Sequence, residues 1–112
     1  MIRRRGENIS AWELESLLSQ NPHVAECAAV GVPSDIGEED VKVVIVPTKG
    51  CSIDPVALHA WCRTQMAHFM IPRYIELRDT LPRTDVGKVA KELLKKLGTT
   101  VWDATTIQQP EE

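Results

Sequence analysis

The pair Gly87-Lys88 is the part of this 112-residue sequence whose residue types and spacing most directly suggest chemistry. A lysine beside a glycine could bind a phosphate group, but a phosphate-binding P-loop has another glycine five residues earlier and a serine or threonine after the lysine. Pro82 and Val89 stand at those two positions. The P-loop interpretation therefore fails, and the pair needs another explanation.

The structure expected around Lys88 does not explain why a lysine stands at this position. The sequence after Gly87 predicts a helix whose apolar face consists of Ala90, Leu93, Leu94 and Leu97. A cation in the first turn of a helix is disfavoured by the helix dipole, by about 0.3–1 kcal/mol. Stability thus gives no reason for Lys88, which leaves a solvated surface lysine, favoured by composition, or a functional one.

Two charged runs offer further candidates. Arg3, Arg4 and Arg5 precede Gly6 and could bind a phosphate-bearing ligand through their forked guanidinium donors, although a solvated terminal run is the commoner explanation. The acidic residues between 35 and 40 could be paired catalytic carboxylates, but without a pocket they are better interpreted as a charged surface turn.

The histidines and cysteines raise the question of a metal site. His23 and Cys27 are four residues apart, and His59 and Cys62 are three apart. Cys62 belongs to an apolar helix face and Cys27 to an apolar strand, and no close pair is repeated, which favours structural roles. The sequence therefore predicts no metal site.

Local patterns predict the elements that position these residues. Capping boxes or N-caps with hydrophobic staples, at Ser10 and Asp54, predict a helix over 11–20 and a second helix that ends at 70–72 before proline. Three apolar stretches predict strands, and they cover residues 24–32, 41–46 and 73–77. We expect an acidic loop over 33–40 and a turn over 81–84.

These elements predict a small α+β domain, with a sheet of about three strands flanked by helices and an N-terminal hairpin. We expect this domain to cover residues 1–98 and the polar stretch 99–112 to be a frayed tail. The charge of −3, from 13 Lys+Arg and 16 Asp+Glu, argues against a dedicated nucleic-acid binder. No apolar run approaches the roughly 20 residues of a membrane span. With no signal sequence and an odd set of three cysteines, we expect a cytoplasmic protein.

Four motifs in one order also resemble the C-terminal domain of AMP-forming acyl-CoA synthetases, which belong to the adenylate-forming superfamily. The resemblance covers roughly residues 2–95 and rests on Arg5-Gly6-Glu7-Asn8-Ile9-Ser10, Val30-Gly31-Val32-Pro33-Ser34-Asp35 with Gly37-Glu38, Phe69-Met70-Ile71-Pro72, and Leu81-Pro82-Arg83-Thr84 with Gly87-Lys88. It looks most similar to the carnitine or crotonobetaine and fatty acyl-CoA ligase branches. It implies the fold of the C-terminal lid of these enzymes.

The resemblance implies a catalytic role for Lys88. In these enzymes the matching lysine bridges the carboxylate of the acyl substrate and the oxygens of ATP, and Gly87 lets the backbone present it. Attack of a carboxylate on the α-phosphorus gathers negative charge, and a positioned donor can contribute about 10²–10³ in rate. Lys91 departs from the family pattern, in which arginine is common at that position.

The resemblance also implies a second orientation of the lid, reached by rotation after the acyl adenylate forms. In it, Arg4, Arg5, Gly6 and Glu7 would lie beside a tunnel for the pantetheine arm of CoA. A side chain at Gly6 would narrow that tunnel. One small domain would thus serve two half-reactions with two faces.

The family further implies the substrates and partners. ATP and CoA would be substrates at the interface with a large N-terminal domain. That domain would contain the acyl pocket and would be the main binding partner of Mg²⁺. The lid alone would bind none of these groups and would be inactive. The resemblance does not identify the carboxylic acid. Two alternatives stay open: a free-standing, non-catalytic binding module with the lid fold, and the lid of a peptide-synthetase or luciferase-type adenylating enzyme.

Overall fold

A computed structural model describes residues 2–4, 6–34, 37–95 and 101–107 of the chain. The N-terminal hairpin, helix and long strands are β1 (Ile2–Arg4), β2 (Glu7–Ile9), α1 (Ala11–Leu18), β3 (Val24–Pro33) and β4 (Glu39–Pro47). The second half contains α2 (Pro55–Gln65), β5 (Tyr74–Leu77), β6 (Trp102–Asp103) and the short 3₁₀ helices η1 (His68–Met70), η2 (Lys91–Leu94) and η3 (Ala104–Ile107).

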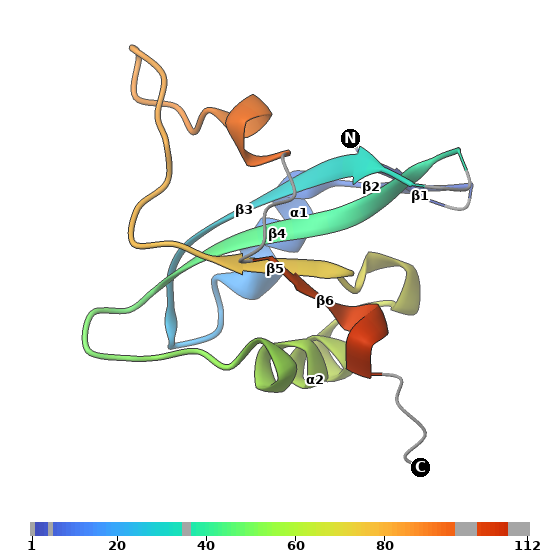
Figure 1. Ribbon diagram of the computed structural model, residues 1–112, viewed down its shortest axis with the longest axis horizontal. Coiled ribbons are helices and arrows are strands. Elements are labelled where there is room, and N and C mark those ends of the chain that lie inside the picture. The colour runs from blue at the N-terminus through green and yellow to red at the C-terminus, as the bar shows by residue number, and fades with distance from the viewer. Residues whose placement is uncertain (1, 5, 35–36, 96–100, 108–112) are drawn as a thin grey trace.

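The strands form two sheets, and their arrangement confirms the predicted α+β fold with an N-terminal hairpin. The main sheet has the order β3-β4-β5-β6, in which β4 and β5 are parallel and the other pairs antiparallel. β1 and β2 form a separate hairpin beside the β3–β4 ribbon (Figure 1). The main sheet therefore has four strands where the sequence predicted about three.

Both faces of the main sheet are covered, which explains why β3 and β4 are almost continuously apolar. Side chains alternate along a strand. In β4, Val41, Val43 and Ile45 join a core cluster with residues of α1 and α2, whereas Val44 and Val46 join a second cluster with Leu81 and Leu94. The second cluster supports the segment that carries Lys88.

Both predicted helices begin where their caps indicate. Ser10 Oγ accepts from Glu13 N at 3.2 Å at the start of α1, and Asp54 Oδ1 accepts from Val56 N at 3.0 Å at the start of α2. The predicted end of the second helix at 70–72 is wrong. Met66 is extended, so α2 ends at Gln65 and the chain continues into η1.

The third predicted helix is also wrong at its start. Only residues 91–94 are helical, as η2, and the segment before them is an extended loop. The cause is a non-local pairing, because Arg83 and Val89 form an antiparallel bridge and Ala90 N donates to Pro82 O at 2.8 Å. The predicted positions Leu97 and Gly98 lie outside the described residues.

The described part of the predicted frayed tail, residues 101–107, instead contains β6 and η3. Trp102 pairs with Ile75 of β5, and its ring lies 5.4 Å from the His59 ring of α2. This polar stretch therefore closes one edge of the sheet. The expected domain boundary at residue 98 lies outside the described residues, and the described helices are all too short or too polar to cross a membrane.

Candidate functional site

Lys88 lies on a loop that projects from the face of the main sheet where the second core cluster lies. Gly87 has a φ of 86°, and its amide donates to Thr84 O at 2.9 Å. The Lys88 amide donates to Thr84 Oγ1 at 3.3 Å, and the Lys88 carbonyl accepts from Thr84 N at 2.6 Å. The left-handed conformation of Gly87 closes this tight turn, because other residues rarely adopt it.

The base of the Lys88 loop is fastened to the sheet at two points. Arg83 forms an ion pair with Glu26 of β3 and donates to Gly87 O at 3.3 Å. Leu81 and Leu94, on either side of the loop, are buried in the second core cluster. The loop therefore extends from a fixed base.

The side chain of Lys88 is exposed on this loop. Throughout the described ranges, its ammonium group has no hydrogen bond or ion pair. The expectation that Lys88 lies in the first turn of a helix is wrong, so a helix dipole does not act on it. A projecting cation without a partner is available to bind an anionic group.

A buried lysine, which the sequence analysis did not single out, supports the same region. Lys42 of β4 has 0% of its side chain exposed, and its Nζ donates to Leu94 O at 2.6 Å and lies 2.7 Å from Glu76 Oε1. Lys91 Nζ lies 2.8 Å from Glu15 Oε2 of α1. Both lysines attach η2 to the body of the domain. A charged residue within the apolar run of β4 was the available signal for Lys42, because a strand buried on both faces must pair it.

The second predicted face is the β1–β2 hairpin. Arg4 pairs with Glu7 in the hairpin register, which leaves a two-residue turn that contains Gly6. Gly6 has a φ of 83°, and Gly6 and Glu7 are exposed. Arg5, predicted to belong to this face, lies outside the described residues.

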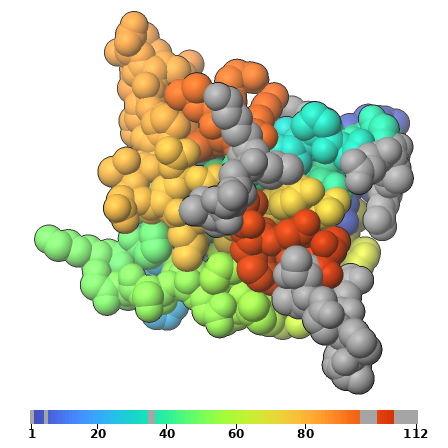
Figure 2. All heavy atoms as spheres, in the orientation of Figure 1, coloured from blue at the N-terminus to red at the C-terminus, as the bar shows by residue number. Residues whose placement is uncertain are grey.

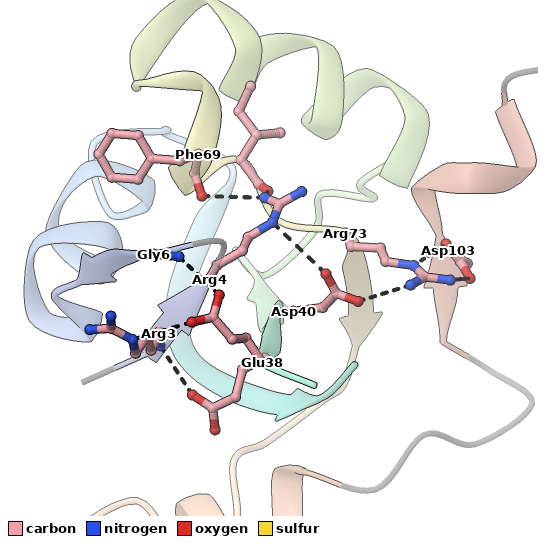
Figure 3. Close-up of polar contacts among 10 residues, drawn as sticks. Arg3, Arg4, Gly6, Glu38, Asp40, Phe69, Arg73 and Asp103 are labelled. Atoms are coloured by element: carbon pink, nitrogen blue, oxygen red, sulfur yellow. Dashed lines mark hydrogen bonds and ion pairs between the residues drawn. The ribbon is translucent and has the colours of Figure 1, made fainter. Parts of the chain in front are cut away.

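Arg4 of the predicted face points into the domain (Figure 3). Its side chain is only 14% exposed, and its Nη1 donates to Phe69 O at 3.2 Å and to Ile71 O at 3.0 Å. Its Nε lies 3.8 Å from Asp40 Oδ1. In this arrangement Arg4 holds the hairpin against η1.

Asp40 links Arg4 to a further ion pair. Arg73 Nη1 donates to Asp40 Oδ2 at 2.8 Å, and the same guanidinium donates to both oxygens of Asp103, at 3.1 and 3.2 Å. Burial opposes ionisation of Asp103, but hydrogen bonds from Arg73 and Thr105 outweigh it and hold the pKa of Asp103 below its ordinary value. The hydrogen bond with Asp103 raises the pKa of Arg73. This chain of charges connects the hairpin to β4, β5 and β6.

The structure does not bring the two predicted faces together. The loop over residues 82–90, orange in Figure 1, lies at one end of the molecule, and the turn of the β1–β2 hairpin lies at the other. The orange segment also stands out from the body in the space-filling view (Figure 2). Lys88 and Gly6 therefore belong to two separate surfaces of the domain.

The residues considered for a metal site take structural positions. Cys62 is buried, which raises its pKa to about 12, and Cys27 Sγ donates to Glu15 O at 3.4 Å. Burial lowers the pKa of His59, whose ring lies against Trp102. The described residues contain no group of three or more His, Cys, Asp or Glu that could hold a metal ion.

Comparison with known proteins adds to this geometry. The model of the family described as "AMP-binding enzyme C-terminal domain" matches residues 13–88. The crotonobetaine/carnitine–CoA ligase of Proteus mirabilis (strain HI4320) is 38% identical over 95 residues, which are 85% of this chain and 18% of the ligase. This chain thus spans about a fifth of the length of that relative.

Solved structures share the fold as well. ATP-bound MatB from Rhodopseudomonas palustris superimposes with a TM-score of 0.75 at 36% identity, over 80% of this chain and 18% of MatB. The anthranilate CoA ligase AuaEII, in complex with anthranoyl-AMP, gives a TM-score of 0.75 at 31% identity, over 84% of this chain and 19% of AuaEII. Each similarity is confined to a small part of a much longer protein.

Proposed function

The chain belongs to the AMP-binding enzyme C-terminal domain family, and from this premise we propose that it is the mobile lid of an ATP-dependent, AMP-forming acyl-CoA ligase. In the first half-reaction a carboxylate and ATP would give an acyl adenylate and pyrophosphate. In the second, the CoA thiol would attack the acyl carbonyl and release AMP. The observation that carries the proposal is the unpartnered ammonium of Lys88 at the end of an anchored, projecting loop.

Lys88 would act in the first half-reaction. When a carboxylate oxygen attacks the α-phosphorus, negative charge grows on the phosphoryl oxygens and on the leaving pyrophosphate. A lysine on the lid can stabilise that charge when the lid closes over the substrates. Its ammonium has no partner among the described residues to give up first, so all of its donors can face the phosphoryl oxygens. The loop bound at its base by Arg83 and Glu26 would set where the ammonium arrives.

The β1–β2 hairpin would act in the second half-reaction. Gly6 and Glu7 are exposed at its turn, and a Cβ added at Gly6 would meet no atom of the described residues within 4 Å. Gly6 thus leaves room outside the domain, where the pantetheine arm would pass. Arg4 would shape this face from behind through its contacts with η1, and Arg5 is proposed to belong to the same face from the sequence resemblance.

The relatives support this choice of substrates. The P. mirabilis relative is named a CoA ligase, MatB has been solved with ATP, and AuaEII has been solved with an acyl adenylate. We therefore propose ATP and CoA as substrates and a large N-terminal domain as the partner that binds them. The described residues offer no cluster of acidic ligands for Mg²⁺, so no step is assigned to Mg²⁺ on this domain. The free thiols Cys27, Cys51 and Cys62 support a reducing, cytoplasmic location.

The test uses a chimera in which this chain replaces the C-terminal domain of the P. mirabilis crotonobetaine/carnitine–CoA ligase, and it measures each half-reaction separately. We expect Lys88→Ala to slow acyl-adenylate formation by about 100-fold to 1000-fold, the range for a lost transition-state donor. Thioester formation from supplied acyl adenylate should stay within a few-fold of the parent. Equal loss in both assays would contradict the role of Lys88.

A second variant in the same chimera tests the proposed role of the β1–β2 hairpin. We expect Gly6→Trp to leave adenylate formation unchanged and to impair thioester formation, because the indole would occupy the space left by the glycine. The measurement is kcat/KM for CoA with supplied acyl adenylate. Normal use of CoA by Gly6→Trp would remove the assignment of this face.

A further inference from the structure

The side chains of two adjacent glutamates, Glu38 and Glu39, accept hydrogen bonds from the backbone of the β1–β2 hairpin. Figure 3 shows Glu38 beside Arg3 and Gly6. Glu38 Oε1 accepts from Gly6 N at 2.9 Å, and Glu38 Oε2 accepts from Arg3 Nε at 3.2 Å. Glu39 Oε1 accepts from Arg3 N at 3.1 Å. One carboxylate from the β3–β4 connection and one from the first residue of β4 thus hold two main-chain amides of the hairpin. One of these amides belongs to the glycine of its turn.

The hairpin needs such support at its turn. Each of its strands has three residues, and an isolated two-stranded hairpin is at best marginally stable in water. At the open end, Ile2 and Ile9 pair with each other and are buried in the core. At the turn, Gly6 and Glu7 are exposed and have no such burial. The contacts of Arg4 hold the neighbouring strand residue, and Glu38 adds a hydrogen bond to the turn itself.

Glu38 is itself held in place by its own loop. Its carbonyl accepts from Ser34 N at 2.8 Å, and Gly37 N donates to Ser34 O at 3.2 Å. Glu39 is the first residue of β4 and pairs with Pro33 of β3. The two carboxylates consequently extend from backbone that is fixed by the main sheet.

Gly31 of β3 provides the space that Glu39 occupies. A Cβ built at Gly31 would lie 2.6 Å from Cδ and 2.6 Å from Oε1 of Glu39, far inside van der Waals contact. The φ of Gly31 is not in the left-handed region, so this close approach, and not the backbone conformation, favours a glycine here. Gly31 thus makes room for the carboxylate of Glu39, which accepts from Arg3 N.

We propose that Glu38 is a positioning residue for the turn at Gly6, assisted by Glu39 in the space that Gly31 leaves open. Glu38 acts through the Gly6 amide and does not touch the substrates. We call the hydrogen bonds that Glu38 and Glu39 accept from Arg3 and Gly6 the clamp. The proposal rests on the proposed function, because it assigns the clamp to the hairpin face that would serve the second half-reaction. Release of the clamp should therefore affect the use of CoA and not the formation of the adenylate.

The test places Glu38→Ala, Glu38→Gln and Gly31→Ala in the chimera described above. We expect Glu38→Ala to lower kcat/KM for CoA by about threefold to tenfold, the effect of losing the hydrogen bond that holds the Gly6 amide, with adenylate formation within about twofold of the parent. Glu38→Gln keeps an oxygen that can accept from Gly6 N and should restore most of the loss. Gly31→Ala displaces only the flexible end of Glu39, so the domain should fold, with a smaller loss in the same half-reaction.

A direct readout on the 112-residue chain is amide hydrogen exchange. Exchange of the Gly6 amide should become faster in Glu38→Ala and return toward the parent rate in Glu38→Gln, while Glu92→Gln, in an exposed pair with Lys95, should change neither exchange nor CoA use. Equal loss in both half-reactions, or unchanged Gly6 exchange in Glu38→Ala, would overturn the proposal.

The clamp and the face that it serves can fail separately. If Gly6→Trp impairs CoA use and Glu38→Ala does not, the clamp alone is overturned. If Gly6→Trp uses CoA normally, the face itself is lost and the clamp has no catalytic purpose, even where exchange shows that the contact exists.

Discussion

Lys42 has one of the longest side chains in the core, and the acceptors at its tip include a carbonyl and a carboxylate oxygen. The ammonium lies between Leu94 O and Glu76 Oε1, while Arg78 approaches the other oxygen of Glu76 at 3.6 Å. An unpaired buried charge costs several kcal/mol, so each member of the pair makes the other tolerable. The pair also fixes the segment that follows the Lys88 loop.

We expect Lys42→Met to lower the free energy of unfolding by about 3 kcal/mol or more, because Glu76 would lose its main partner in a largely buried site. Urea unfolding of the 112-residue chain measures this change. The matched control is Lys95→Met, whose exposed pair with Glu92 is worth at most about 1 kcal/mol. Equal effects of the two substitutions would show that Lys42 contributes no more than a surface charge.

At the scale of elements, β6 is fastened to the sheet by charge as much as by strand pairing. It has two residues, and the two carboxylate oxygens of Asp103 accept from Nε and Nη2 of Arg73. The pKa of Asp103 is lowered from its ordinary 3.8, so the folded state favours the ionised carboxyl more than the unfolded state does. Its stabilisation is present above the unfolded pKa and is lost as the pH falls through the lower folded value.

Asp103→Asn should therefore flatten the acid side of the stability curve. Below about pH 4, the unfolding free energy of the parent should fall more steeply with decreasing pH than that of the variant, whereas above about pH 6 the two curves should run parallel. Unfolding by urea at a series of pH values checks this. Parallel curves throughout would mean that Asp103 titrates alike in both states.

The elements that the sequence predicted correctly are those with local causes. The caps Ser10 and Asp54 act on amides two or three residues away, and the apolar runs of β3 and β4 are buried on both faces wherever they pack. The failures have distant causes. The bridge between Arg83 and Val89 replaces the start of the predicted third helix, and β6 is too short to carry an apolar pattern.

The candidate site divides in the same way. Lys88, Gly87 and Gly6 were found as motifs, and their exposed turns agree with proposed roles in binding. The partners that hold those turns come from other elements: Glu26 for the Lys88 loop and Glu38 for Gly6. Spacing along the chain does not encode such contacts. Arg4 likewise has the residue type of a ligand-binding group, but its guanidinium is engaged with Phe69 O and Ile71 O inside the domain.

At the scale of the whole molecule, the proposed lid would depend on a partner domain for its reaction. Lys88 lies on a projecting loop, and the described residues bring no second catalytic group to it. We expect the purified 112-residue chain to release no pyrophosphate from ATP with any carboxylic acid tested, including carnitine and fatty acids. Sustained turnover by this chain alone would refute the lid assignment.

The strand β4 carries the supports of both ends of the domain to which we have assigned functions as proposals. Asp40, near its start, contacts Arg4 of the hairpin, and Lys42, two residues later, holds the segment behind the Lys88 loop. Both ends are therefore attached to the same strand and would move together when the domain rotates as a rigid body. A rotation that brings one end to the reaction centre would withdraw the other by the same angle. In the proposed cycle, a single orientation of the domain would decide which half-reaction can proceed, so adenylate formation and thiol attack would be separated in time by mechanics alone.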